Sequence, residues 1–264
     1  MILGVAALVT IASATPYLVG NQGNYSSDGV SIIPNYNNDG SPDIYEAINK
    51  LAGTKFDGND DASYLRVEND GIWTMVDTKA PVALIGLTAG YTNTLGVYYG
   101  SKQVNLLTAT GFGFADQSGV YSNFTYLPND ITTSTPLGFY LNANQQNMYY
   151  SEAAKNTNDN GYDHMLTYNL SAAGFKTITV GNNGKNTTFT LDDAYLLCWE
   201  DLKISGGLYT NYGDGKGTTD GDYDDMMYIV AKVKPVPVPE PGMLSLAGLS
   251  LLSLIGLAAS RRKR

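Results

Sequence analysis

The chain has 264 residues, enough for one large domain or two small ones. Charged residues make up 16% of it, below the roughly 25% of an average globular protein, while hydrophobic residues make up 43% and suffice for a core. The net charge of −9 argues against nucleic-acid binding, because an acidic surface repels phosphates and attracts cations. The 29 glycines and 20 tyrosines are typical of an all-β, secreted-type protein.

The first apolar segment, residues 2–14, reads ILGVAALVTIASA and ends on an A-x-A cleavage pattern. It is too short to span a membrane as a helix. We therefore interpret residues 1–14 as a secretory signal peptide that is cleaved after Ala14. The charged region that opens such signals does not precede it, so we expect a longer leader.

The next segment, residues 15–62, contains the pattern of a calcium-binding loop, NYNNDGSPDIYE. It resembles an EF-hand-like or dockerin-like loop and departs from D-x-[DN]-x-[DN]-G-x5-E only at its first position, which is Asn. The predicted oxygen ligands are Asn35, Asn37, Asp39, Asp43 and Glu46. We expect a helix over residues 44–51 to close the loop. The alternative is an Asn/Asp/Gly turn that only caps this helix.

Residues 63–233 show short apolar or alternating runs between turn signals. The runs lie at 63–69, 71–78, 82–88, 95–100, 102–108, 136–143, 147–151, 164–170, 175–180, 188–191, 194–202 and 225–234. This spacing predicts roughly ten to twelve strands in a β-sandwich or jelly-roll-like domain. The only cysteine, Cys198, lies in one of these runs, so no intramolecular disulfide is possible and we expect it to be buried.

Acidic residues crowd the ends of the last two long runs, in WEDL (199–202) and DGDYDDMMYIV (220–230). Neighbouring carboxylates raise one another's pKa unless something compensates their charge, and no basic cluster lies nearby in the sequence. A divalent cation would compensate it, and hard carboxylate oxygens favour calcium over zinc. The predicted ligands are Glu200, Asp201, Asp220, Asp222, Asp224 and Asp225. The alternative is a solvated turn that caps strand ends.

These two acidic segments resemble a bacterial extracellular domain, domain-of-unknown-function family 4114. Its hallmark is E-D-L, a Gly/Asp-rich loop, and D-x-D-[YF]-N-D before a hydrophobic strand, here Glu200–Leu202 and Asp220–Asp225. Asp163-His164 also fits the family, and the resemblance covers residues 63–233. It implies a β-rich fold in which the acids bind calcium or act in catalysis. Asp224 replaces the usual Asn and the loop between the two motifs is longer, so the resemblance does not determine the geometry of the ligands in this chain.

Glycoside hydrolysis is one alternative to calcium binding. Glu200 with Asp222 or Asp225 could form the carboxylate pair of a glycoside hydrolase, although the sequence does not determine their separation. The only histidine, His164, lacks a G-x-S-x-G partner motif, and Asp163 beside it on a strand points to the opposite face. We predict that His164 is packed or hydrogen-bonded near the acidic loop and that the protein is not an enzyme.

A carbohydrate-binding module is the other alternative. Trp73, Trp199 and several tyrosines could form a platform on which sugar rings stack. Tyrosines also simply fill strands, so the composition does not decide between the two readings.

The last segment, residues 234–264, has a Pro-rich linker, a 17-residue apolar run from Met243 to Ala259 and a basic end, Arg261–Arg264. The apolar run is just long enough to span a bilayer, and the basic end favours the cytoplasmic side. The segment resembles the PEP-CTERM sorting signal, with Pro239, Glu240 and Pro241 as its motif. This resemblance implies recognition by an exosortase, cleavage near the motif and release outside the cell. The alternative is an ordinary anchor helix.

Together these features predict a secreted, calcium-stabilised structural or adhesive protein of the bacterial cell surface or extracellular matrix. Its expected partners are an exosortase, extracellular polysaccharide or surface proteins, and the inner membrane transiently through the C-terminal helix.

Overall fold

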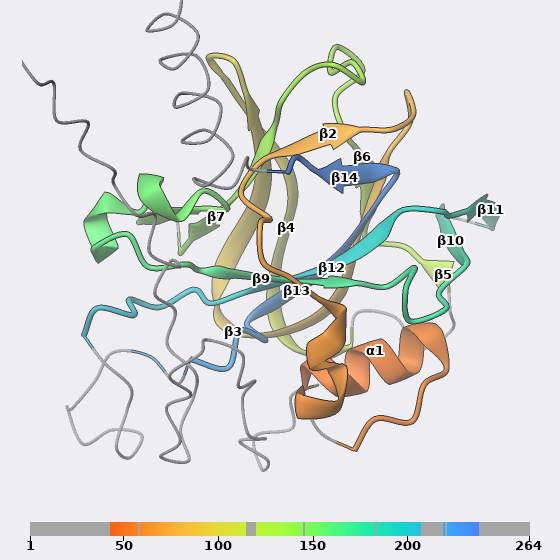
Figure 1. Ribbon diagram of the computed structural model, residues 1–264, viewed down its shortest axis with the longest axis horizontal. Coiled ribbons are helices and arrows are strands. Elements are labelled where there is room, and N and C mark those ends of the chain that lie inside the picture. The colour runs from red at the N-terminus through yellow and green to blue at the C-terminus, as the bar shows by residue number, and fades with distance from the viewer. Residues whose placement is uncertain are drawn as a thin grey trace, which may run out of the picture. The chain divides into compact units, whose positions relative to one another are not determined.

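The computed structural model describes residues 43–57, 59–114, 120–144, 146–182, 184–206, 219 and 221–237 (Figure 1). The described residues up to Val236 belong to one compact unit. The predicted signal peptide and residues 238–264 of the predicted sorting segment lie outside the described residues, as do Asn35, Asn37, Asp39 and Asp220. The first residues of that segment, Lys234 and Pro235, belong to a strand instead of a free linker. Among the residues described, no helix is long and apolar enough to span a membrane.

The described part of the chain contains one α-helix, three short 3₁₀ segments and fourteen strands. The helical elements are α1 (Ile44–Ala52), η1 (Asn59–Leu65), η2 (Ala153–Lys155) and η3 (Thr157–Asp159). The first eight strands are β1 (Arg66–Val67), β2 (Trp73–Met75), β3 (Pro81–Tyr99), β4 (Lys102–Phe114), β5 (Val120–Tyr121), β6 (Phe124–Tyr126), β7 (Gly138–Ala143) and β8 (Asn147–Tyr150). The others are β9 (Met165–Asn169), β10 (Thr177–Asn182), β11 (Lys185–Thr190), β12 (Ala194–Trp199), β13 (Met226–Ala231) and β14 (Val233–Pro235).

The helix α1 confirms the expectation for residues 44–51. Its apolar side chains Ile44, Ala47 and Ile48 recur at helical spacing and are fully buried. It ends at Gly53, whose φ of 70° lies in the left-handed region and whose amide donates to the carbonyl of Asn49 at 2.9 Å. The helix therefore covers one face of the sheet and stops where the chain turns away.

The main sheet has nine strands around the 19-residue strand β3. Its order is β1-β9-β12-β13-β3-β7-β8, in which β13 and β7 pair with successive stretches of one edge of β3. The strands β4 and β6 pair with the opposite edge of β3. Register shifts between Ala89 and Asn93 and between Leu95 and Gly96 are β-bulges, which bend a strand and increase its twist. The sheet curls into a half-barrel (Figure 1).

A mostly β fold is confirmed for the described residues, while the arrangement of the strands differs from the two stacked sheets of a β-sandwich. The sequence predicts separate strands at 82–88 and 95–100, with the turn-like residues between them as a break. In the structure these residues form the bulge of one continuous strand, β3. One curled sheet results, with two small sheets beside it, β11-β10-β5 and β14-β2.

Both faces of the central strands are buried, and every residue of β12 and β13 is buried. Inside the curl, Trp199 and Tyr228 belong to a core with Trp73 from β2. On the outer face, Cys198 and Met227 belong to a second core that includes residues of α1 and of the β10–β11 hairpin. The burial of Cys198 is confirmed.

The alternative of a sugar platform built on tryptophans is excluded for Trp73 and Trp199, because both have 0% exposure. Indole rings are the largest apolar side chains, and the curl of the sheet encloses them both. Trp73 packs edge-on against Phe139 and Tyr195 instead of facing solvent.

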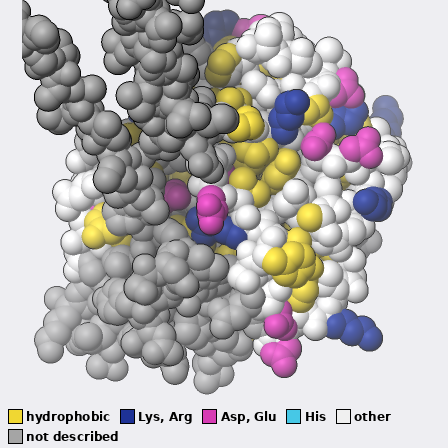
Figure 2. All heavy atoms as spheres, in the orientation of Figure 1, with side chains coloured by type: hydrophobic (Ala, Val, Ile, Leu, Met, Phe, Trp, Pro, Cys, Tyr) yellow, Lys and Arg dark blue, Asp and Glu magenta, His cyan; other side chains and the backbone are white. Residues whose placement is uncertain are grey.

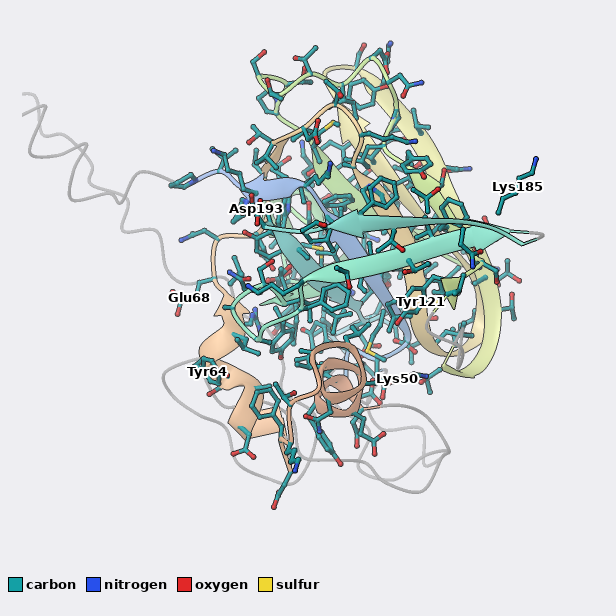
Figure 3. All side chains as sticks on the ribbon, turned by 90° about the vertical axis from the view of Figure 1, so that its right-hand side faces the viewer. Lys50, Tyr64, Glu68, Tyr121, Lys185 and Asp193 are labelled. Carbon is teal, nitrogen blue, oxygen red and sulfur yellow. The ribbon has the colours of Figure 1, made fainter. Side chains whose placement is uncertain are left out.

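The described surface mixes charges of both signs. Figure 2 shows basic and acidic side chains interspersed with small apolar areas on one face. Figure 3 shows the β10–β11 hairpin lying across a neighbouring side, with Lys185 at its tip and Tyr64 near α1.

Candidate metal centre

The acidic residues meet where β12 ends and β13 begins. These antiparallel strands pair Trp199 with Met226, so Glu200, just after β12, lies beside Asp225, just before β13. One carboxylate oxygen from each of Glu200, Asp222 and Asp225 lies within 4.8 Å of the other two. The apolar runs YLLCW and MMYIV pair because both are suited to a buried strand, and their pairing brings the acids that follow and precede them together.

Asp222 reaches the group through an unusual backbone turn. Tyr223, which follows it, has a φ of 60°, a conformation that costs energy for a residue with a side chain. Tyr223 is fully buried, and its hydroxyl donates to the carbonyl of Asp163 at 2.8 Å. These contacts hold the strained turn in place. Glu200 and Asp225 are buried, and Asp222 keeps partial exposure.

Backbone amides support the carboxylates. The amide of Asp201 donates to Oδ2 of Asp225 at 2.7 Å, and that of Leu202 donates to Oε1 of Glu200 at 3.0 Å. The Asp201 carboxylate accepts a hydrogen bond from the side chain of Asn93, in the bulge of β3. Hydrogen bonds within the folded chain thus position the carboxylates of Glu200, Asp201 and Asp225.

The three oxygens fit a hard divalent cation. Oxygens bound to one calcium ion at about 2.3–2.6 Å can lie at most about 5 Å apart, so three oxygens within 4.8 Å of one another could all reach one ion. Carboxylates are the ligands that calcium prefers, and three of them placed together in a buried group favour a bound cation. The structure thus brings together three of the six predicted ligands of this site.

The other three predicted ligands do not belong to this group of three carboxylates. Asp201 is turned to Asn93. Asp224 is buried, with 3% exposure, and its amide lies 3.4 Å from Oδ1 of Asp222. Asp220 lies outside the described residues.

His164 lies directly behind the acidic group, as predicted. Its Nδ1 is 3.0 Å from the carbonyl oxygen of Glu200, and its Nε2 is 2.8 Å from Oδ2 of Asp159. A carbonyl oxygen only accepts, so Nδ1 carries a hydrogen. The residue that orients the imidazole is Asp159 and not the neighbouring Asp163.

Asp159 is held as a carboxylate. Burial alone would raise its pKa, but hydrogen bonds from His164 and from the amides of Ser205 and Ile204 outweigh burial and hold its pKa well below the ordinary value. The imidazole of His164 also stacks on Tyr149, with ring centroids 3.6 Å apart and planes at 11°. This buried arrangement fixes the carbonyl of Glu200 from behind.

The negative charge of the acidic group influences the buried side chain of Tyr149. Its ring is fully buried, and its hydroxyl makes no hydrogen bond within the described part of the chain. Burial raises the pKa of Tyr149, and the negative charges of Asp159, Glu200, Asp201 and Asp225 raise it further. The hydroxyl therefore lies within electrostatic reach of several carboxylates at once.

A second pair of buried acids lies at the β1–β9 edge. Burial raises the pKa of Asp70 well above its ordinary value, and the charge of Asp163 raises it further, against a smaller lowering by Arg66. Burial also raises the pKa of Asp163. The Asp70 Oδ2 atom has no hydrogen-bond partner among the described residues. This pair is not arranged as a cation site, because Arg66 already supplies positive charge.

Of the predicted N-terminal loop, only Asp43 and Glu46 lie in the described part of the chain. Asp43 precedes α1 and is 8% exposed, and Glu46 lies in the first turn of the helix. Asn35, Asn37 and Asp39 are outside it, so this loop stays a prediction.

Sequence reasoning missed three residues of the centre: Asn93, Tyr149 and Asp159. Each contacts or influences a residue that is distant in the chain, such as Asp201, 108 positions after Asn93. Only Asp159 carried a local signal, since it lies five residues before the single histidine.

No family model and no curated protein sequence matches this chain. The resemblances to domain-of-unknown-function family 4114 and to the PEP-CTERM signal therefore stay predictions.

Proposed function

We propose that the protein is a secreted, calcium-stabilised structural or adhesive component of the bacterial cell surface or extracellular matrix. The observation that carries the calcium part is the placement of Glu200, Asp222 and Asp225, with one oxygen of each within 4.8 Å of the others. The secreted location rests on the predicted signal peptide and on the resemblance of residues 234–264 to an exosortase sorting signal.

A bound calcium ion would join the end of β12 to the start of β13 and neutralise most of the charge of the three carboxylates. Because the three acids come together only in the folded chain, binding would stabilise the fold. The gain is RT ln(1 + [L]/Kd), about 2.7 kcal/mol at a hundredfold excess of calcium over Kd. Such a gain suits a secreted domain without an intramolecular disulfide.

The burial of the acids favours this role over glycoside hydrolysis. Glu200 has 0% exposure and Asp225 has 8%, whereas a polysaccharide must reach both catalytic carboxylates. Retaining glycosidases place these groups about 5–5.5 Å apart, and inverting ones place them further apart. We therefore propose no catalytic role for the group.

Calorimetric titration of the full-length chain with calcium chloride tests the proposal. A second binding event could come from the predicted N-terminal loop, so the comparison needs Asp222→Asn, which removes one ligand of this centre. The matched control is Asp192→Asn, because Asp192 is an exposed acid in the turn before β12. We expect Asp222→Asn to remove one binding event and Asp192→Asn to remove none. Identical titrations of all three proteins would contradict the proposal.

A further inference from the structure

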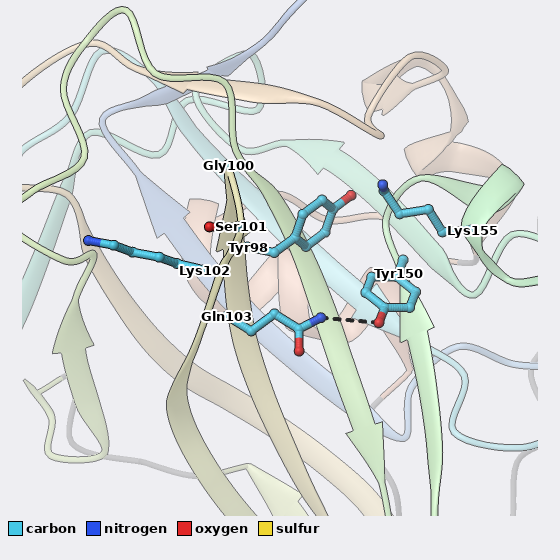
Figure 4. A pocket seen from close by; sticks show the side chains of 7 residues that line it. All are labelled: Tyr98, Gly100, Ser101, Lys102, Gln103, Tyr150 and Lys155. Atoms are coloured by element: carbon cyan, nitrogen blue, oxygen red, sulfur yellow. Dashed lines mark hydrogen bonds between the residues drawn. The ribbon is translucent and has the colours of Figure 1, made fainter.

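A pocket of about 450 Å³ lies at the turn between β3 and β4 (Figure 4). Its lining includes Tyr98, Gln103, Tyr150 and Lys155, none of which belongs to the candidate metal centre. Gly100, with a φ of 55°, forms the two-residue turn with Ser101, and a side chain added at Gly100 would meet no atom within 4 Å. The pocket therefore has free space on the side formed by Gly100.

Two reciprocal glycine–tyrosine pairs join β3 to β7 beside this pocket, and one of their tyrosines, Tyr98, lines it. Tyr98 on β3 pairs with Gly138 on β7, and Gly96 on β3 pairs with Tyr140 on β7. Each tyrosine ring lies over the opposite glycine so closely that a Cβ at Gly138 would be 2.2 Å from Cζ of Tyr98, and one at Gly96 would be 2.0 Å from Cζ of Tyr140. The contact with Gly138 thus fixes the Tyr98 ring before any ligand arrives, which lowers the entropic cost of binding.

Tyr98 and Tyr150 present an aromatic corner. Their ring centroids are 5.5 Å apart and the planes meet at 82°. The Tyr98 hydroxyl donates to Glu152 at 2.7 Å, and the Tyr150 hydroxyl accepts a hydrogen bond from the amide of Gln103 at 3.1 Å (Figure 4). Gly138 covers one side of the Tyr98 ring, but Tyr98 and Tyr150 are both partly exposed, so apolar surface remains available beside fixed polar groups.

The charges around the pocket are balanced. Lys155 is 3.3 Å from the carboxylate of Glu152, and Lys102 pairs with Asp130. The Lys155 ammonium also lies 5.3 Å from the centroid of the Tyr98 ring. Two ammonium groups repel a cationic ligand, and their carboxylate partners leave no net positive charge for an anionic one. The ligand that suits this lining is uncharged and rich in hydroxyl groups.

We propose that this pocket binds a neutral oligosaccharide. A sugar ring has an apolar face that packs on tyrosine and a rim of hydroxyls that exchange hydrogen bonds with Gln103, Ser101 and Lys155. The predicted sugar platform would thus lie on tyrosines of β3 and β8 rather than on the buried tryptophans. This inference goes beyond the proposed function, because it names a ligand class and does not depend on calcium.

Calorimetric titration of the full-length chain with four neutral hexasaccharides tests the inference. The probes are the β-1,4-glucan, β-1,3-glucan, β-1,4-xylan and β-1,4-linked N-acetylglucosamine hexamers, with oligogalacturonate as the anionic comparison. We expect at least one neutral probe to bind with a Kd on the order of 0.1 mM. Tyr150→Ala is expected to weaken this binding at least about tenfold.

Two further variants provide a control outside the pocket and a second change inside it. Tyr91→Ala removes an exposed tyrosine of the same strand, β3, outside the pocket, and should bind like the unaltered chain. Gln103→Leu changes an exposed side chain and should lose binding even if Tyr150→Ala unfolds. Absence of binding by all four neutral probes would overturn the inference. Equal binding by unaltered chain and pocket variants, or tighter binding of oligogalacturonate, would do so too.

Discussion

The backbone amide of Asp201 donates a hydrogen bond of 2.7 Å to the carboxylate of Asp225. This contact joins the residue two positions after β12 to the residue just before β13. One Asp225 oxygen therefore holds the two strand ends together, and the same carboxylate belongs to the candidate metal centre. A cation bound at this centre would therefore be coupled to the folding of the chain through Asp225.

Asp222→Asn should change stability in opposite directions with and without calcium. In chelator, the variant removes one of three neighbouring negative charges, so we expect unchanged or higher stability. In millimolar calcium it lacks a ligand, so most of the calcium-dependent gain should vanish. Urea unfolding under both conditions measures this. Equal calcium gains in variant and unaltered chain would contradict the account, and Asp192→Asn serves as the control.

His164→Ala should destabilise the fold by about 3–5 kcal/mol, because it removes the buried hydrogen bond to Asp159 and the stacking on Tyr149 and leaves a cavity. The Asp159 carboxylate then keeps only its backbone donors. Asp159→Asn in the same background should recover part of this loss by removing the charge. Unfolding of the two single variants and the double variant measures the coupling. Additive losses would show that the two side chains act independently.

Asp70→Asn should stabilise the protein at pH 7 more than at pH 4. The folded-state pKa of Asp70 is raised above its ordinary value of 3.8, so its contribution is fully present below that value and is lost as the pH rises toward the folded pKa. The variant cannot ionise and avoids this loss. Unfolding free energies at both pH values, with Asp192→Asn as control, measure the difference. A gain that does not depend on pH would contradict the assignment.

Gly138→Ala should destabilise the protein by about 1–3 kcal/mol, because its Cβ would lie 2.2 Å from Cζ of Tyr98 and force the ring away. The matched control is Gly90→Ala in β3, where an added Cβ meets no atom within 4 Å. Thermal unfolding of both variants makes the comparison. Equal effects would show that the glycine–tyrosine pairs do not matter.

Local sequence was enough to predict α1 and the buried strands β12 and β13. Ile44, Ala47 and Ile48 repeat at helical spacing, and YLLCW and MMYIV are uninterrupted apolar runs between turn signals. The continuity of β3 was not predictable in this way, because the residues from Gly90 to Asn93 have turn composition and become a bulge only when β4 pairs beside them.

The candidate centre was likewise predicted in part. The acids Glu200, Asp222 and Asp225 were identified because their crowding is visible in the chain. The contact that turns Asp201 away from these acids was not predictable, because its partner Asn93 is brought near it only by long-range strand pairing. Tyr98 and Gly138 were missed for the same reason, because their proximity results from the register of β3 with β7.

Thermal unfolding of the full-length chain in millimolar calcium, in magnesium and in chelator tests the central claim most directly. The account predicts a midpoint several degrees higher in calcium than in chelator. It also predicts a much smaller rise in magnesium, which requires stricter octahedral geometry, and loss of most of the calcium shift in Asp222→Asn. A midpoint that is the same in calcium and in chelator would contradict the claim that Glu200, Asp222 and Asp225 hold a stabilising ion.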